Sequence, residues 1–133
     1  MEHPIKALIK SADSAISRED FDSLLNFYTD DAVLVIKPGL LATGKEQIRK
    51  AFITIAAYFN HSIEVRQGKM ELIESGDSAL VIMETLLNFR DADGGSNALT
   101  RRATYVFRKD AGNRWLCAID NSYGTDLLDV PPP

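Results

Sequence analysis

The sequence predicts an α+β domain in which helices come first and an antiparallel sheet follows. In the first half of the chain, apolar residues recur three and four positions apart, as on one face of a helix. From residue 63 onward, apolar and polar residues alternate in runs that are separated by short turns. The chain has 133 residues, so we expect one domain over residues 1–125. Residues 126–133 are expected to form a Pro-rich tail.

Two helices are predicted before residue 30. The first starts near Pro4, which the first turn of a helix tolerates. Its apolar face consists of Ile5, Leu8, Ile9, Ala12, Ala15 and Ile16. The second is expected to start at Ser17 as its N-cap, with Asp20 reaching back as in a capping box. Its apolar stripe is Phe21, Leu24, Leu25 and Tyr28.

A short strand over residues 32–36 and a turn over residues 37–39 lead to the third predicted helix. This helix is expected to begin at Thr43, because the run TGKE (residues 43–46) matches a capping box. Its apolar face is the most regular in the sequence and consists of Ile48, Ala51, Phe52, Ile55, Ala56 and Phe59.

Four strands are predicted in the second half, over residues 63–74, 78–90, 98–109 and 114–122. Gly68 interrupts the alternation of the first of these, which indicates a β-bulge.

The strand over residues 78–90 is largely apolar on both faces, which indicates that both faces are covered. The helices of one chain can cover only the concave face of the sheet. We therefore expect a homodimer through the outer face, and the alternative is that the C-terminal segment folds over it.

Composition limits the function classes. The formal net charge is −4, which does not favour a nucleic-acid partner. Cys117 is the single cysteine, so no disulfide can form within the chain. The sequence has no secretory signal and no run of about 20 apolar residues, so a cytoplasmic protein without a membrane partner is expected. No metal-ligand spacing and no nucleotide-binding motif is present, so we expect no metal and no cofactor.

Three runs together resemble nuclear-transport-factor-2-like (NTF2-like) proteins of the SnoaL type. They are DFDSLLNFYTDDAVLV (residues 20–35), TGKEQIRKAF (residues 43–52) after Pro38-Gly39, and YVFRKDAGNRWLCAIDNSYG (residues 105–124). The resemblance implies a cone, a curved antiparallel sheet wrapped around three N-terminal helices, with a pocket at its open end. It also implies homodimers through the outer face of the sheet. It is weak evidence for chemistry, because one fold carries many functions.

The resemblance includes the ketosteroid isomerases, but the residues they need are missing here. By alignment, Ala12 stands where they have a Tyr on the first helix, and Lys37 precedes Pro38 where they have the general-base Asp. Phe52 lies near their second Tyr, and Thr104 near their protonated Asp. Because proton transfer needs a base and an oxyanion donor, we exclude ketosteroid isomerase activity.

Two charged residues are the candidate catalytic groups. Asp120 lies near the end of the last strand; if its side chain faces inward, a carboxylate between apolar walls has a raised pKa and can act as an acid or base. The alternative is a structural carboxylate that holds the strand end or a loop amide. Arg102 is expected to face the pocket with Thr104, and its planar fork suits a carboxylate or phosphate. A structural ion pair with Asp120 is the alternative. If the register shifts by one residue, Arg101 takes the place of Arg102.

Lys37 is another candidate base or anion ligand, and the alternative is a solvated lysine in a turn. His61 lies just past the third helix, where a proton carrier or a cap is expected. Tyr28 is expected in the helix–sheet core with its hydroxyl at the edge, and Cys117 as a small buried residue.

The leading hypothesis is a small-molecule pocket protein, with an acid/base reaction such as isomerisation, cyclisation or hydration as its candidate chemistry. The residues predicted to line the pocket are Phe52, Ile55, Tyr58, Met83, Thr104 and Ala118. The second hypothesis is a non-enzymatic dimeric interaction module whose cone is filled by its own side chains, such as Phe59 and Phe89.

Overall fold

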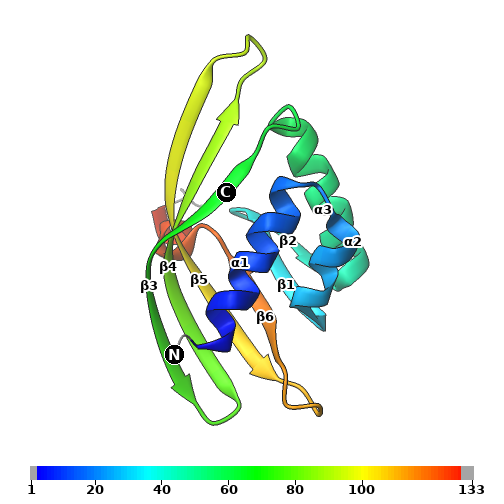
Figure 1. Cartoon of the computed structure of the whole chain (residues 1–133), viewed down its shortest axis with the longest axis vertical. Coiled ribbons are helices and arrows are strands. Elements are labelled where there is room, and N and C mark those ends of the chain that lie inside the picture. The colour runs from blue at the N-terminus through cyan, green and yellow to red at the C-terminus, as the bar shows by residue number, and fades with distance from the viewer. Residues whose placement is uncertain (1–2, 130–133) are drawn as a thin grey trace.

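A computed structural model describes residues 3–129 and confirms the predicted fold class (Figure 1). Helices pack on the concave side of one curved, six-stranded sheet that does not close into a barrel. The helices are α1 (Pro4–Ser17), α2 (Phe21–Leu24) and α3 (Lys45–Tyr58), with 3₁₀ turns η1 (Leu25–Phe27) and η2 (Gly124–Asp129). The strands are β1 (Tyr28–Lys37), β2 (Leu40–Thr43), β3 (Glu64–Ser75), β4 (Ser78–Arg90), β5 (Ser96–Lys109) and β6 (Trp115–Asn121).

The strand order is β2-β1-β6-β5-β4-β3. Strands β3 to β6 form the predicted antiparallel meander, and β1 and β2 form a hairpin. The hairpin joins the sheet through a parallel pairing of β1 with β6, which the sequence patterns did not predict. This pairing places Tyr28 opposite Cys117 and Leu34 opposite Asp120. Residues from the two ends of the chain therefore meet in the middle of the sheet.

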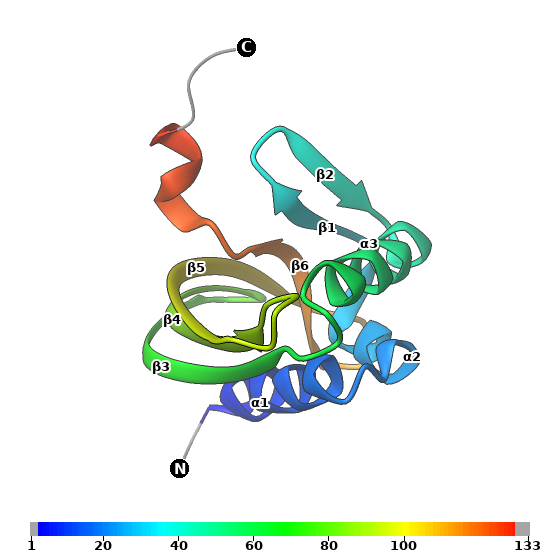
Figure 2. The ribbon, with the colours of Figure 1, turned by 90° about the horizontal axis from the view of Figure 1, so that it is seen from above.

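Figure 2 shows how β3, β4 and β5 curl, with α1 lying along β3 and α3 beside β1. Strand β3 is one of the two edge strands of the sheet, and α1 covers part of it. The backbone N–H of Val65 donates to the Ser17 hydroxyl at 3.1 Å, so the helix satisfies a donor that the edge leaves free. Within residues 3–129, no helix combines the length and apolar character that crossing a membrane requires.

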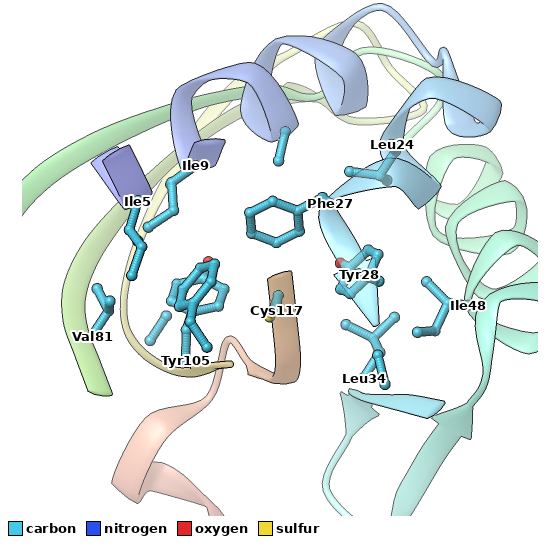
Figure 3. Packing of buried hydrophobic residues seen from close by; sticks show 14 of the residues in the cluster. Ile5, Ile9, Leu24, Phe27, Tyr28, Leu34, Ile48, Val81, Tyr105 and Cys117 are labelled. Carbon is cyan, nitrogen blue, oxygen red and sulfur yellow. The ribbon is translucent and has the colours of Figure 1, made fainter. Parts of the chain in front are cut away.

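Between α1 and the concave face of the sheet lies a close-packed apolar core (Figure 3). The ring of Phe27 lies edge-on to Tyr28 and to Phe107, with centroids 5.1 and 5.5 Å apart. Ile5 and Ile9 of α1 close this core from the helix side and are almost fully buried. The core fixes where α1 sits, and thereby which of its residues face the open end.

The second helix starts later than predicted. Ser17 is the last residue of α1, and Asp20 is the N-cap of α2, accepting from the Ser23 N–H at 3.3 Å. Helix α2 lasts one turn and continues as the 3₁₀ turn η1, because the chain becomes extended at Tyr28. The strand β1 therefore begins four residues before the predicted one.

The predicted capping box at Thr43 is also wrong. Thr43 ends β2, a strand that was not predicted, and the N-cap of α3 is Gly44. The backbone N–H of Thr43 donates to Oε1 of Gln47 at 2.9 Å, so Gln47 has the role that was expected of Glu46.

The β-bulge at Gly68 is confirmed. The pairing of β3 with β4 shifts between Gln67 and Met70, and a Cβ on Gly68 would lie 2.8 Å from the Cβ of Glu84. Only glycine fits this close approach without a shift of the neighbouring strand. The predicted strand over residues 78–90 coincides with β4. In the predicted tail, residues 126–129 belong to η2, and residues 130–133, which include the three prolines, lie outside the described part.

Both faces of β4 are apolar, as the sequence indicated, but within one chain only the concave face is covered. Ala79, Val81 and Met83 are buried under the helices, whereas Leu80 and Ile82 on the outer face remain 38% and 42% exposed. One apolar row crosses four strands of this outer face, because the registers place its members side by side. This outer apolar row consists of Ile73, Leu80, Val106 and Ile119. Within residues 3–129, the C-terminal segment does not bury it, since Ile119 is still 43% exposed.

Candidate functional site

A cavity of about 160 Å³ lies between α1, α3 and the concave face of the sheet. Its walls are mainly apolar and include Phe52 and Ile55, as predicted, together with Leu34 of β1. Its polar lining residues are Asp13, Thr85, Arg101, Tyr105, Asp120, Ser122 and Tyr123. An apolar cavity with a few polar groups is the usual character of a ligand site.

Asp120 faces this cavity because a β-bulge in β6 re-aims it. Trp115 and Cys117 point into the core, so simple alternation would turn residue 120 outward. The pairing of β6 with β5 shifts between Cys117 and Ile119, which leaves Ala118 as an extra residue. Asp120 therefore points inward and is only 7% exposed.

One hydroxyl holds the Asp120 carboxyl in place. The Tyr28 O–H donates to Oδ2 of Asp120 at 2.6 Å, deep in the fold. Burial raises the pKa of Asp120 to about 6, and the hydrogen bond from Tyr28 opposes this rise because it favours the ionised form. The Tyr28 hydroxyl is thus part of the site and does not lie at the edge of the core, since Tyr28 is 1% exposed.

A second carboxyl, Asp13 on α1, lines the same cavity and is 8% exposed. Burial raises the pKa of Asp13 to about 7, the negative charge of Asp120 adds to the rise, and the Gln67 amide opposes it. Among residues 3–129, no group forms a hydrogen bond with Oδ2 of Asp13. The sequence carried a signal for this residue that the prediction missed. Asp13 lies four residues after Ile9 and three before Ile16, on the apolar face of the helix.

The two carboxyls differ in how readily they lose a proton. Asp120 ionises first, and its charge then helps to keep the proton on Asp13. Between about pH 6 and 7, the pair therefore holds one carboxylate and one neutral carboxyl. Such a pair can accept a proton from one atom of a ligand and donate one to another.

The orientation predicted for β5 is wrong by one residue. Ala103, Tyr105 and Phe107 are the buried residues, so Arg101 lies on the concave face and lines the cavity. Arg102 lies on the outer face, opposite Glu84. The pairing of Met83 with Ala103 fixes this phase, because residues directly opposite each other share a face.

Arg101 lies at the rim of the cavity, and its guanidinium is 4.2 Å from the centroid of the Tyr123 ring. Within residues 3–129, Arg101 forms no ion pair with Asp120, so the structural ion pair considered for this site is absent there.

Four other residues predicted to line the pocket lie elsewhere. Met83 is in the core below the cavity. Thr104 is on the outer face, where its hydroxyl accepts from Nδ2 of Asn121 at 3.2 Å. Ala118 is the extra residue of the bulge and does not line the cavity. Tyr58 is 79% exposed at the end of α3.

The remaining candidates are also outside the cavity. Lys37 is exposed at the end of β1. The Nδ1 of His61 lies 2.9 Å from Oε1 of Glu19 at the surface, which supports a role in the loop contact. Cys117 is a fully buried core residue, as predicted. Across residues 3–129, His, Cys, Asp and Glu do not gather in groups of three that could hold a metal ion.

The fold is shared with proteins of several kinds. Aln2 from a Streptomyces species superposes with a TM-score of 0.81 at 14% identity over 97% of each chain. A ketosteroid isomerase-like protein from Erwinia carotovora atroseptica superposes with a TM-score of 0.73 at 24% identity, over 87% of this chain and 89% of the other. The association domain of CaMKII from C. elegans gives 0.69 at 21% identity, with the same coverage. At these identities the likeness shows the fold alone.

No curated protein sequence matches the chain significantly. The sequence profile of the SnoaL-like domain, in contrast, matches residues 5–118, from the first turn of α1 to the bulge in β6. That span includes α1 to α3, strands β1 to β5 and the first part of β6, and it ends just before Asp120. The chain therefore belongs to the SnoaL-like family of the NTF2-like superfamily.

Proposed function

We propose that this protein binds a small, partly apolar molecule in the inner cavity and catalyses proton transfer on it without a cofactor. The reaction would be of the isomerase, cyclase or hydratase type. The observation that carries the proposal is the pair of buried carboxyls, Asp13 and Asp120, which face one apolar cavity and differ in proton affinity.

The two carboxyls have separate roles in this proposal. Asp120 is the base, because it ionises first and the Tyr28 hydroxyl stabilises its charge. It takes a proton from a carbon or a water held in the cavity and returns it at the next step. Asp13 is the acid, because it keeps its proton up to about pH 7. It gives this proton to a second atom of the ligand while Asp120 takes one, and it recovers a proton from that atom when Asp120 returns its own. No redox partner is needed, since every step moves protons alone.

The size of the cavity limits the ligand. Ligand pockets commonly enclose roughly 300–1,000 Å³, and this cavity encloses about 160 Å³. A cavity of about 150 Å³ accommodates benzene, so a molecule of roughly six to ten non-hydrogen atoms suits this one. Arg101 at the rim would meet an electronegative or anionic group on the outward end of the ligand.

A generic carbon acid tests the chemistry without knowledge of the natural substrate. Exchange of the C1 protons of nitroethane for deuterium, followed by NMR, reports proton abstraction by a base. We expect the protein to accelerate this exchange, with a rate that rises through about pH 6 as Asp120 ionises and falls through about pH 7 as Asp13 loses its proton.

Asp120→Asn removes the base and should return the exchange to the buffer rate, a loss of at least about 100-fold in the catalysed part. Asp126→Asn is the matched control, because it removes an exposed carboxylate on η2 and should leave the rate unchanged. Equal rates for the natural protein and Asp120→Asn would contradict the proposed function.

The second candidate function is a homodimeric interaction module, and the outer apolar row favours it. Three large members of this row, Ile73 on β3, Leu80 on β4 and Ile119 on β6, remain exposed on one face, and Ile82 is exposed beside Leu80. Such a patch commonly marks a protein–protein interface. A second copy of this chain covering the row would bury it, and this does not conflict with a ligand in the cavity on the opposite face. A dimer that shows no ligand binding and no proton exchange would leave the interaction module as the remaining function.

A further inference from the structure

A second hollow, of about 460 Å³, lies between α1 and the edge strand β3, which run side by side (Figure 2). Ligand pockets commonly enclose roughly 300–1,000 Å³, so this hollow has the volume of one, whereas the inner cavity is smaller. Asp13 and Val65 line both hollows and form the wall between them. We call the second hollow the basic groove; it is lined by Lys6, Lys10, Ser14, Val65, Arg66 and Met70.

Two hydrogen bonds fix α1 against β3 along this groove. Near the start of the helix, Nε2 of Gln67 donates to the Lys6 carbonyl oxygen at 3.5 Å. At its end, the Val65 N–H donates to the Ser17 hydroxyl at 3.1 Å. The two walls of the groove therefore hold a defined position relative to each other.

The charged groups of the groove come from both walls. Lys6, Lys10 and Ser14 are spaced four residues apart, so they lie on one side of α1. Arg66 lines the groove from β3, and the half-buried Val65 adds an apolar surface.

The groove is positively charged, although the chain has a formal net charge of −4. Within residues 3–129, Lys6, Lys10 and Arg66 form no ion pair. The carboxyl that lines the groove, Asp13, has a pKa raised to about 7 by burial, so below that pH it does not offset the three cations.

Helix stability does not explain these lysines. Lys6 lies in the first turn of α1, where a positive charge opposes the helix dipole, and that turn has no acidic residue. Lys6 and Lys10 are also four residues apart, a spacing at which like charges repel. A sequence that breaks local rules in this way commonly does so at a functional site. A bound anion would relieve both conflicts.

We propose that the basic groove binds a small phosphate monoester, with its phosphate between Lys6, Lys10 and Arg66 and its apolar part against Val65 and Met70. A guanidinium fork and two ammonium groups match the several acceptor oxygens of a phosphate. The proposal goes beyond the function assigned to the inner cavity, because proton transfer by Asp13 and Asp120 needs no anion in this groove.

Phenyl phosphate is a suitable probe, since it carries about −1.5 to −2 charges at about pH 7 and has one apolar ring. In a protein-detected NMR titration at low salt, we expect saturable binding with a Kd on the order of 1 mM or tighter. Amide shifts should be confined to residues 6–14 and 65–70, and binding should weaken as salt is added. Inorganic phosphate, which lacks the ring, should bind several-fold more weakly.

Lys6→Glu separates a binding role from a structural one. It places an acidic residue in the first turn and creates a Glu–Lys pair with Lys10, so it should raise the Tm of the unliganded protein by about 2 °C. The same variant should weaken phenyl phosphate binding about tenfold or more, because it replaces an attraction with a repulsion. Lys50→Glu, at an exposed position on α3, is the matched control for net charge and should change the affinity less than about twofold.

Three outcomes would overturn the proposal. Equal losses of affinity in Lys6→Glu and Lys50→Glu would show that only the net charge of the chain attracts the phosphate. Shifts around Arg101 without shifts at Lys6 and Lys10 would assign the probe to the inner cavity. Absence of saturable binding up to about 10 mM phenyl phosphate would show that the groove is a solvated surface.

Discussion

Asp13→Asn is expected to stabilise the protein at about pH 8 and to leave its stability almost unchanged at about pH 4. The carboxyl has an ordinary pKa of 3.8 and a pKa of about 7 in the folded protein. Between these values the folded state holds the proton and the unfolded chain has released it. The stabilisation from this proton is complete below about pH 4 and is lost as the pH rises through about 7.

The magnitude follows from the same two values. Their difference corresponds to an ionisation penalty of about 4 kcal/mol in the folded state at high pH. Asp13→Asn removes both the burial penalty and the repulsion from Asp120, but local rearrangement lowers the real penalty, so a gain on the order of 2–4 kcal/mol is expected at about pH 8. Asn is neutral at both pH values. Any cost of its amide group therefore cancels when the change in the free energy of unfolding at about pH 4 is subtracted from the change at about pH 8.

Urea denaturation at about pH 4 and about pH 8 measures the effect as a change in the free energy of unfolding. Asp126→Asn is the control for losing one carboxylate at an exposed position, and its effect should be small at both pH values. An equal loss of stability in Asp13→Asn at about pH 4 and about pH 8 would contradict this prediction. In that case the buried carboxyl would carry no ionisation penalty, and it could not be the acid of the pair.

Three further predictions concern the rest of the fold. Gly124→Ala should cost more than about 2 kcal/mol in thermal or urea unfolding, because Gly124 has a φ of +54° and an added Cβ would collide with the Arg102 carbonyl oxygen. Gly76→Ala, at a φ of +56° with open space around it, should cost only about 1 kcal/mol, and equal costs would exclude the collision. Ile82→Arg places a charge on the outer face and should convert the proposed homodimer to monomers in analytical ultracentrifugation. Ile53→Arg, at a similarly exposed position on α3, is the control and should leave the dimer intact. If the natural protein is itself a monomer, the dimer is contradicted. Cys117 should react with a thiol reagent only as fast as the protein unfolds, because it is fully buried and burial raises its thiol pKa well above the ordinary value; rapid labelling of the folded protein would disprove this.

The fold class was predictable because its signals are local. Helical spacing in α1 and α3, alternation in β3 to β6, and the bulge at Gly68 all appear in short stretches of sequence. The parallel pairing of β1 with β6 has no such signal, since it joins segments about 90 residues apart and depends on how the whole sheet closes. The starts of α2 and α3 were predicted wrongly, because each has several possible capping residues within a few positions and packing decides which one begins the helix.

The site was predicted less well, because it depends on which alternate residues of each strand face the cavity. Arg101 and Arg102 are chemically equal candidates, and only the burial of Ala103 and Phe107 selects between them. The inward orientation considered for Asp120 is the one observed, and its cause is one the sequence does not display, the extra residue Ala118 in β6. A β-bulge reverses the face of every later residue in its strand. A bulge without a glycine, like the one at Ala118, leaves no sign in the sequence, so the faces of the residues after it cannot be assigned by alternation.

The position of the candidate site also follows from the topology. Tyr28 and Asp120 are separated by 92 residues, and their hydrogen bond forms only when β6 docks beside β1. Asp13 reaches the same cavity only when α1 packs on the edge strand β3 and on the core beneath it. The first helix, the first strand and the last strand must therefore all be in place before the two carboxyls share one low-dielectric cavity. Because their raised pKa values depend on that burial, partial opening of either end of the chain would return both groups toward ordinary carboxylates, and the proposed acid/base activity should be lost before the protein unfolds globally.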